Sequence, residues 1–344
     1  MSLIASTIRV VERAPVPDAV TRRGIDFVVG RTRRRLSQFP ASREDDFARE
    51  LESCPIALHV DAANAQHYEL PPEFFVLTLG PRRKYSCCYY PAGDETLAEA
   101  EMLALEATAG HAGLGDGQRI LELGCGWGAL SLFMAERYPN ATITAVSNST
   151  PQRLYIDAEA RARGFGNLTV VTADMNSFHP DGEFDRVVSV EMFEHISNWR
   201  ALLNRIRCWL ARDGRLFVHV FSHRSQPYRF DHTDTADWVA RHFFTGGIMP
   251  SHGLIGRFPG CFEIETQWRW SGRHYQRTAQ AWLANFDANR PRIDPLLVAV
   301  YGANAAIWRR RWRLFYLATA GLFGHAGGQE WGVSHYLLRP GGLT

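Results

Sequence analysis

The sequence predicts an α/β fold, namely a doubly wound and mostly parallel sheet of seven strands. The prediction rests on two observations. From about residue 119 onward, short runs rich in β-branched residues alternate with longer segments of helical character. A glycine-rich turn at residues 123–129 follows the first of these runs, where a strand of a parallel sheet passes into a helix and where such proteins bind ligands.

The expected elements follow the chain in order. A first helix ends near Arg137, and a second begins near Thr150 and Pro151, which read as an N-cap and a proline at the first helical position. Two further helices are expected over about residues 278–323. The seven expected strands cover residues 120–123, 141–147, 168–173, 184–190, 214–220, 262–270 and 331–338.

At 344 residues, the chain exceeds the size at which a single core usually stops growing. We therefore expect a helical N-terminal region over residues 1–80 and a main domain over residues 81–344. Within the main domain, residues 223–260 break the pattern with aromatic residues, glycines and prolines. We interpret this stretch as a lid inserted over the strand ends.

Composition limits the classes of partner. A net charge of +2 argues against a general nucleic-acid binder. The basic run Arg31, Arg33, Arg34 and Arg35 fits a solvated helix face better than a surface for acidic lipid or an acidic partner. The six scattered cysteines form no Cys-x-x-Cys pair, the N-terminus lacks the pattern of a signal peptide, and no apolar stretch could span a membrane. The expectation is a cytoplasmic protein.

Three ligands could use the glycine-rich turn. A nucleoside triphosphate is disfavoured because no Lys followed by Ser or Thr is present. A dinucleotide fits the spacing of Gly124, Gly126 and Ala129, yet the acid expected about 20 residues later is absent. The third option is S-adenosylmethionine (SAM), whose compact cationic end suits a short turn beside Glu122. Asp174 would then face the adenine.

The segment directly after the fourth expected strand, residues 191–195, places Glu191, Glu194 and His195 where a substrate would bind. These groups can move a proton near neutral pH. If the segment is helical, the three side chains share a face, and the crowded acids raise each other's pKa. Position alone supports an ordinary helix start equally well. A zinc site is disfavoured, because the H-x-x-E-H pattern would need His in place of Glu191.

Seven separated motifs now point to a family. They lie at residues 84–89, 121–128, 190–195, 217–219, 243–247, 274–278 and 330–332. In this order they resemble class I SAM-dependent methyltransferases, and more narrowly the group of cyclopropane-fatty-acid synthases and coclaurine N-methyltransferases. The resemblance runs from about residue 55 to the C-terminus and implies a Rossmann-like sheet.

The resemblance also implies a cofactor site for SAM, which leaves as S-adenosylhomocysteine (SAH). The residues matching the family's cofactor positions are Tyr85 and Ser86, Gly124 and Gly126 at the methionine end, Asn148 and Gln152 at the ribose, and Asp174 and Met175 at the adenine.

The two branches of this group differ at the position of Glu191. Cyclopropane synthases usually carry glycine there and bind bicarbonate through four residues, whose equivalents here are Cys87, Glu194, His219 and Tyr275. The N-methyltransferase branch carries Glu at that position. In that branch, the residues matching Glu191, Glu194 and His195 are implicated in amine binding and deprotonation.

The sequence thus favours N-methylation of a small aromatic or isoquinoline-like amine. A pocket for a flat cation is expected around Trp238, Phe243, Phe244 and Trp268, although core packing is the ordinary role of each aromatic residue. The alternative is methylene transfer to unsaturated phospholipid acyl chains, with bound bicarbonate and the arginine run on anionic lipid. A peripheral membrane contact and a homodimer are left open, and a catalytically silent SAM-binding protein is disfavoured.

Overall fold

The computed structural model describes residues 3–58 and 70–341, and it contains the predicted seven-stranded sheet. The strands lie in the order β3-β2-β1-β4-β5-β9-β8. The first five of these run parallel, whereas β9 is antiparallel to both β5 and β8. The bounds are β1 Arg119–Leu123, β2 Thr142–Ser147, β3 Leu168–Thr172, β4 Phe184–Val190, β5 Leu210–His223, β8 Phe262–Ser271 and β9 Trp331–Pro340.

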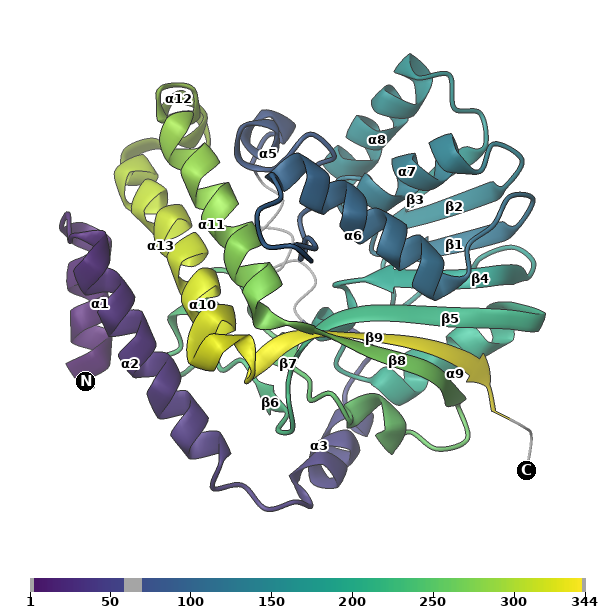
Figure 1. The fold of residues 1–344 in the computed structure, drawn as a ribbon, viewed down its shortest axis with the longest axis horizontal. Coiled ribbons are helices and arrows are strands. Elements are labelled where there is room, and N and C mark those ends of the chain that lie inside the picture. The colour runs from purple at the N-terminus through teal and green to yellow at the C-terminus, as the bar shows by residue number, and fades with distance from the viewer. Residues whose placement is uncertain (1–2, 59–69, 342–344) are drawn as a thin grey trace.

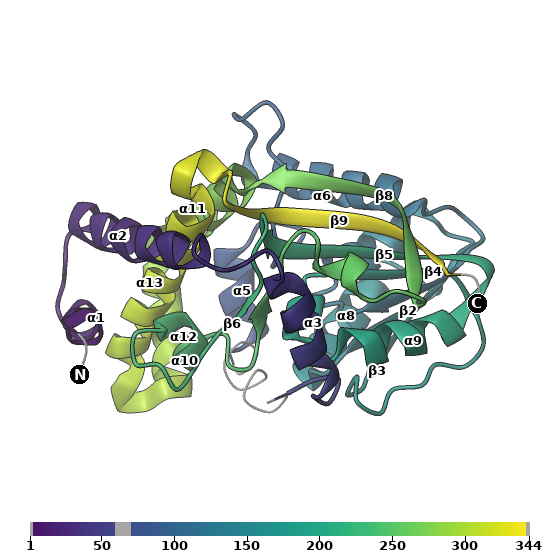
Figure 2. The same ribbon diagram turned by 90° about the horizontal axis from the view of Figure 1, so that it is seen from below.

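Helices cover both faces of this sheet, as a doubly wound fold requires. One face packs against α6 (Leu97–Ala112), α7 (Ala129–Arg137) and α8 (Thr150–Ala162). The other packs against α3 (Arg43–Glu52) and α9 (Trp199–Trp209). Figure 2 shows α6 on one side of the sheet and α3 and α9 on the other.

The central strands are buried on both sides because their alternate residues enter two different cores. Ile120, Val188 and Phe217 pack toward α6 and α7, whereas Leu121 and Val187 pack toward α9. A strand that is buried on both faces carries a continuous apolar run of residues. These runs made the central strands predictable from the sequence.

A helical layer stands beside the strand ends (Figure 1) and combines the two ends of the chain. It contains α1 (Leu3–Arg13), α2 (Asp18–Leu36), α5 (Pro72–Thr78), α11 (Gly272–Ala288), α12 (Arg290–Tyr301) and α13 (Ala305–Gly324). Phe74 of α5 packs with Phe286 and Trp312 of the C-terminal helices. In the predicted N-terminal region, whose residues 1–2 and 59–69 lie outside the described ranges, α1, α2 and α5 pack with α11–α13, whereas α3 packs against the sheet.

The prediction of two helices over residues 278–323 was wrong in its detail. The structure has three helices there, and the first begins at Gly272. A break at Asn289 precedes Arg290-Pro291, where proline suits a new helix start. A 3₁₀ turn, Gly302–Asn304, then separates α12 from α13.

The segment expected to form a lid lies between β5 and β8. It comprises β6 (Tyr228–Arg229), α10 (Trp238–His242), β7 (Ile248–Met249) and a 3₁₀ turn at Leu254–Arg257. The strands β6 and β7 form a separate two-stranded sheet. Ile248 and Met249 are buried, so this segment packs onto the domain at β7.

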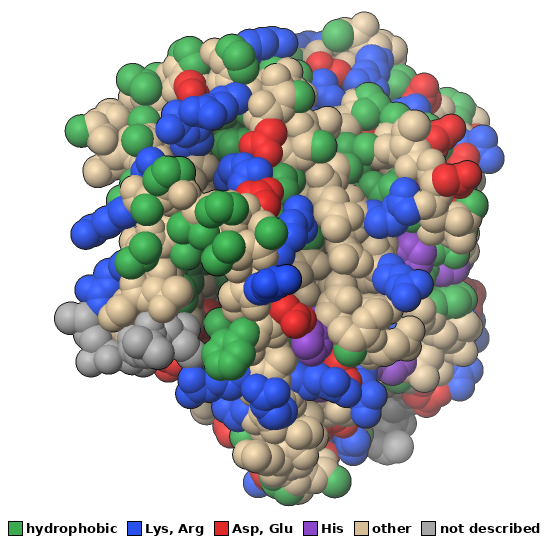
Figure 3. All heavy atoms as spheres, turned by 60° about the vertical axis from the view of Figure 1, so that its left-hand side comes forward, with side chains coloured by type: hydrophobic (Ala, Val, Ile, Leu, Met, Phe, Trp, Pro, Cys, Tyr) green, Lys and Arg blue, Asp and Glu red, His purple; other side chains and the backbone are tan. Residues whose placement is uncertain are grey.

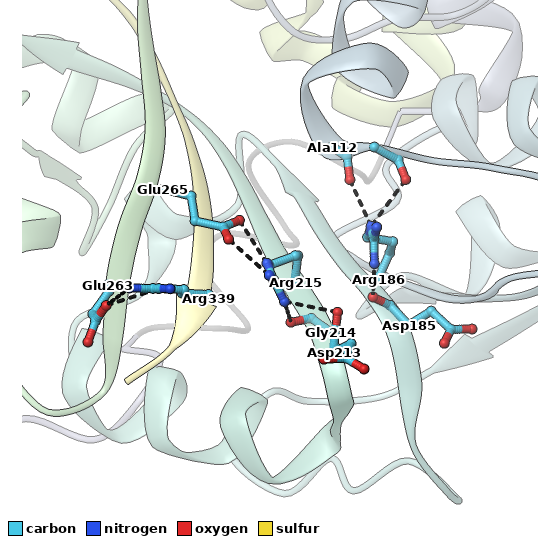
Figure 4. Close-up of polar contacts among 10 residues, drawn as sticks. Ala112, Asp185, Arg186, Asp213, Gly214, Arg215, Glu263, Glu265 and Arg339 are labelled. Atoms are coloured by element: carbon cyan, nitrogen blue, oxygen red, sulfur yellow. Dashed lines mark hydrogen bonds and ion pairs between the residues drawn. The ribbon is translucent and has the colours of Figure 1, made fainter. Parts of the chain in front are cut away.

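Ion pairs stabilise the edge of the sheet at the end opposite the glycine-rich turn (Figure 4). The Arg215 guanidinium donates two hydrogen bonds to Glu265 on β8, at 2.7 and 2.9 Å. Arg186 donates from Nε to the carbonyl oxygens of Ala112 and Gly113 at the end of α6. These contacts hold β8 and α6 to the central strands.

The arginine run lies in the last turns of α2, and its four side chains are exposed. Arg33 pairs with Glu330 at 2.8 Å. Figure 3 shows Lys and Arg side chains spread over one side of the molecule among hydrophobic and acidic ones. In the described ranges, no helix is long and apolar enough to cross a bilayer.

Candidate active site

A cavity opens at the carboxyl ends of β1–β4, the end of a parallel sheet where ligands bind. Part of its wall comes from α6, through Leu105 and Thr108, and from Thr245 of the inserted segment. All eight residues expected at a cofactor line it: Tyr85, Ser86, Gly124, Gly126, Asn148, Gln152, Asp174 and Met175. The fold thus brings these residues from four separate stretches of sequence to one cavity.

Two glycines of the turn after β1 are required by geometry. Gly124 has a φ of +79°, and a Cβ there would lie 2.6 Å from the side chain of Met192. Gly126 has a φ of +53°, and no atom lies within 4 Å of where its Cβ would stand. The backbone at Gly126 is therefore open to a ligand in the cavity.

The ends of β2 and β3 offer a donor and an acceptor. Ser147 Oγ donates to Gln152 Oε1 at 2.6 Å, which leaves the buried Gln152 Nε2 without a partner among the described residues. The exposed Asp174 carboxylate is oriented by the backbone N–H and side-chain amide of Asn176, at 2.9 and 3.0 Å. A buried donor without a partner is costly, so Gln152 Nε2 is suited to donate to a hydroxyl group of a ligand. Together with the Asp174 acceptor, this donor makes the site suitable for a nucleoside.

Glu122 adds a second kind of acid to the cavity wall. It is buried and accepts a hydrogen bond from Ser131 Oγ at 2.5 Å. Burial raises the pKa of this carboxyl to about 7, while the Ser131 hydrogen bond opposes the shift.

The segment after β4 is not the helix that a shared acidic face would require. Only Phe193–His195 forms a short 3₁₀ turn, and Glu191 has a φ of +50°. Glu191 is held in this uncommon conformation by its N–H, which donates to the carbonyl oxygen of His219 at 2.8 Å. The side chains of Glu191 and Glu194 therefore do not stack one turn apart.

The Glu191 carboxylate instead receives three contacts from remote segments. Oε1 accepts the backbone N–H of Cys87 at 2.9 Å and lies 3.2 Å from His219 Nε2. Oε2 accepts the Tyr275 hydroxyl at 2.7 Å. Burial raises the pKa of Glu191, and Lys84, the Cys87 N–H and the Tyr275 hydroxyl act against that shift. The result is a buried carboxylate that borders the cavity and is fixed in direction.

Lys84 is a functional candidate that the sequence reasoning missed. It is 2% exposed, lines the cavity, and donates from Nζ to Ser86 Oγ at 2.5 Å and to the Cys87 carbonyl oxygen at 2.7 Å. A signal was available, because Lys84 is the sole lysine in a chain with 38 Lys and Arg residues. A compact ammonium suits this buried position better than a guanidinium fork.

Glu194 and His195 do not share the surroundings of Glu191. Glu194 is fully buried outside the residues that line the cavity, and neither carboxyl oxygen has a hydrogen-bond partner among the described residues. Burial and the neighbouring Glu191 raise the pKa of Glu194 well above its usual range. His195 lines the cavity, and its ring centroid lies 4.5 Å from that of Phe244.

The other expected pocket residues lie behind or away from the cavity. Cys87, His219 and Tyr275 are buried behind Glu191. Trp238 and Phe243 are also outside the cavity lining and take the core-packing alternative. Trp238 Nε1 donates to Glu12 of α1 at 2.9 Å.

The ring contacts of Phe243 and Trp268 complete this outcome. The Phe243 ring stacks on Phe315 of α13 at a centroid distance of 4.5 Å. Trp268 stacks on His111 of α6 at 3.9 Å. Of the four aromatic residues expected around a flat cation, Phe244 alone contacts a cavity residue, His195, among the ring contacts of the described chain.

The strand order, with an antiparallel β9 inserted beside β5, and the cavity beyond the glycine-rich turn define the class I SAM-dependent methyltransferases. Residues 59–326 match the family model for mycolic acid cyclopropane synthetase. The chain belongs to this family and is a SAM-dependent methyltransferase.

Relatives from both branches are found. (S)-coclaurine N-methyltransferase of Thalictrum flavum subsp. glaucum is 34% identical over 98% of this chain and 96% of its own length. The cyclopropane-fatty-acyl-phospholipid synthase of Escherichia coli K12 is 28% identical over 66% of this chain and 57% of its own length.

A solved structure matches over nearly the whole fold. The crystal structure of coclaurine N-methyltransferase bound to N-methylheliamine and SAH superposes with a TM-score of 0.94 at 32% identity. The match covers 98% of this chain and 100% of that chain. The likeness thus includes the helical layer and the inserted segment as well as the sheet.

Proposed function

We propose that this enzyme transfers the methyl group of SAM to the nitrogen of a small isoquinoline-like amine. The observation that carries the proposal is the Glu191 carboxylate, which borders the cofactor cavity and is fixed by Cys87, His219 and Tyr275. The coclaurine N-methyltransferase relatives and the structure holding N-methylheliamine support an amine acceptor of this size.

Proton removal is the step that these residues serve. An alkylamine is largely protonated at neutral pH, and its lone pair must be freed before it can attack a methyl group. A fixed carboxylate at Glu191 attracts the ammonium, and its raised pKa makes it a stronger base than an exposed glutamate. His195, on the same cavity wall, is the second candidate to accept the proton. Burial and the nearby Glu191 raise the pKa of Glu194 and so favour its protonated, neutral form.

The cofactor assignment follows the cavity wall. Asp174 and Met175 would hold the adenine, Asn148 and Gln152 the ribose, and Gly124 and Gly126 the methionine end, with Tyr85 and Ser86 across the cavity. Bound there, SAM supplies an electrophilic methyl group on a sulfonium. Positioning then accounts for most of the catalysis, since methyl transfer is an in-line displacement.

The cyclopropane alternative is weakened by the same carboxylate. The backbone N–H of Cys87, the Tyr275 hydroxyl and the His219 ring, which the family resemblance assigns to bicarbonate, all contact Glu191. A bicarbonate ion would meet a buried negative charge in their place, which is unfavourable. The contacts support an enzyme in which the Glu191 carboxylate takes the place of bicarbonate.

The test is a product assay with two substrate classes. The protein is incubated with methyl-labelled SAM and either a panel of tetrahydroisoquinolines and simpler amines or vesicles of unsaturated anionic phospholipid, and products are identified by mass spectrometry. We expect a mass gain of one methyl group on a cyclic amine. Methylene addition to acyl chains with no amine product would overturn the proposal.

A peripheral membrane contact and a homodimer stay predictions. Co-sedimentation with vesicles tests the first, and light scattering tests the second.

A further inference from the structure

The His219 side chain begins a row of three histidines that leads away from the active site. His219 on β5 pairs in register with His335 on β9. The His335 Nδ1 atom lies 2.9 Å from Nδ1 of His111, in the last turn of α6. The row therefore runs from Glu191, between the sheet and α6, to the C-terminal end of that helix.

The two inner rings are arranged to face each other. Their centroids are 4.5 Å apart, and the ring planes differ by 30°. Both residues are 0% exposed, and His219 Nδ1 and His335 Nε2 have no hydrogen-bond partner among the described residues. Buried ring nitrogens are normally paired. The two rings are nearly stacked and no hydrogen bond joins them, so a proton would cross between them by reorientation of a ring or through one bridging water.

The outer ring reaches the surface. His111 is half-buried and stacks on Trp268 at 3.9 Å with an angle of 5°. This stack and the hydrogen bond to His335 fix the ring at the point where the row meets solvent.

The row carries no charge of its own at neutral pH. Burial lowers the pKa of His219 and of His335 well below the usual range, and it lowers the pKa of His111. The charged groups that face the row are Glu191 and Lys84 at its inner end. A neutral imidazole has one donor and one acceptor nitrogen, which suits it to receive a proton on one side and release one on the other.

We propose that His219, His335 and His111 form a relay that removes the proton taken from the amine and delivers it to solvent at the end of α6. The proposal rests on the proposed function, because N-methylation of an ammonium leaves one proton on the base for each turnover. When cofactor and amine occupy the cavity, they block the direct route from Glu191 to solvent. A path through the protein would then let the proton leave before the product does.

The transfers balance along the row. Protonated Glu191 gives its proton to His219 Nε2, and His219 releases its Nδ1 proton to His335 Nε2. His335 then releases its Nδ1 proton to His111 Nδ1, and His111 loses its Nε2 proton to solvent. Each ring ends with one proton, as it began, and turns over about χ2 before the next cycle.

Two variants test the relay. We expect His335→Gln to lower kcat about tenfold, with KM and SAM affinity unchanged, and to increase the solvent deuterium isotope effect on kcat. We expect His111→Gln to make kcat depend on the concentration of imidazole buffer, because a small base in solution can then replace the lost ring. Wild-type turnover should be independent of that buffer.

The matched control is His252→Gln. His252 is a half-buried histidine that contacts Ser334, next to His335 on the same strand, but lies outside the row. Its substitution should leave kcat, the isotope effect and the buffer dependence at wild-type values. An equal loss in the control, or wild-type behaviour of both relay variants, would overturn the proposal. If His335→Gln does not fold, the buffer dependence of His111→Gln decides.

A failure of the proposed function is recognised separately. If the wild-type enzyme methylates no amine, that function falls, and the row is tested by the ring-nitrogen NMR signals of its histidines. The Glu191→Gln variant should then change the tautomers of His335 and His111 relative to wild type. Unchanged nitrogen shifts would show that the row is not coupled to Glu191.

Discussion

Tyr275 donates its hydroxyl hydrogen to the Glu191 carboxylate across 2.7 Å, which joins α11 to the segment that follows β4. Glu191 is one of the few residues with a positive φ other than glycine in the described chain, and its side chain turns toward Tyr275, Cys87 and His219. Strained backbone held by several contacts is common at active sites. This relationship gives the first two predictions.

Glu191→Gln should lower kcat for amine methylation by about 100-fold, the lower end of what general base catalysis contributes. The amide cannot take a proton from the amine, and its NH₂ group would replace one of the two oxygens that accept from Cys87 and Tyr275. SAM affinity, measured by calorimetry, should change far less. Glu106→Gln, at an exposed position of α6, is the control. Full activity of the Glu191 variant would assign Glu191 a purely structural role.

Tyr275→Phe should move the acid limb of the kcat/KM profile to higher pH. The Tyr275 hydroxyl stabilises the charged form of Glu191 and so lowers its pKa. When that hydrogen bond is lost, the pKa of Glu191 rises, and the base form is reached only at higher pH. Tyr138→Phe, on the half-buried end of α7, provides the comparison. An acid limb at the wild-type position would separate Tyr275 from the titration of the base.

His195→Ala should shift the pH–rate profile to higher pH. Without a base on this wall of the cavity, turnover depends increasingly on amine that is already deprotonated in solution, and this fraction grows with pH. The exposed His179, substituted in the same way, should have no effect. If the two variants have the same profile, His195 does not accept the proton.

Asp174→Ala should weaken SAM binding about tenfold, equivalent to ~1.4 kcal/mol. The carboxylate, oriented by Asn176, is the acceptor at the end of β3 in the cavity. Isothermal titration with SAM and SAH measures the change. Asp181→Ala, exposed and outside the cavity lining, is the control. An affinity equal to wild type would refute the adenine placement.

Glu122→Gln should change how stability depends on pH. Burial raises the pKa of Glu122 from its ordinary value of 4.5 to about 7 in the folded protein. The folded state therefore binds its proton more tightly, and stability is present below pH 4.5 and lost as pH rises through 7. The full loss is of the order of 3 kcal/mol. Because glutamine does not titrate, the variant should lack this decline in stability. Denaturant unfolding of the cofactor-free protein between pH 4.5 and 7.5 measures it. A decline identical to that of the wild type would contradict the burial argument.

The sheet could be predicted almost completely from sequence. The central strands are short apolar runs, and the two-sided burial of β1, β4 and β5 produces that pattern locally. The edge strand β8 is mostly exposed and carries polar residues as well. The small elements β6, β7 and α10 escaped prediction because two- to five-residue elements carry no measurable periodicity. The prediction of two helices where three exist has a similar reason, since α12 and α13 are separated only by a single short turn.

The aromatic pocket shows where composition misleads. Trp238 and Phe243 occur in a segment rich in aromatic residues, and their surroundings depend on α1 and on α13, at the two ends of the chain. Whether such a ring binds a ligand or fills a core is decided by these distant partners. The same holds for His335 and His111, which are 224 residues apart and carry no mutual signal in the sequence.

The sequence by itself determined the class of this protein, because the strand pattern, the glycine-rich turn and the order of seven motifs are local features. It also brought Cys87, His219 and Tyr275 into consideration, through a resemblance that assigned them to bicarbonate. Only the tertiary structure decided their partner. They lie 104, 28 and 84 residues from Glu191, and their hydrogen-bonding groups converge on its carboxylate once β4, β5 and α11 pack together. A contact over such separations depends on packing and backbone direction, and neither is specified by the residues at the site alone.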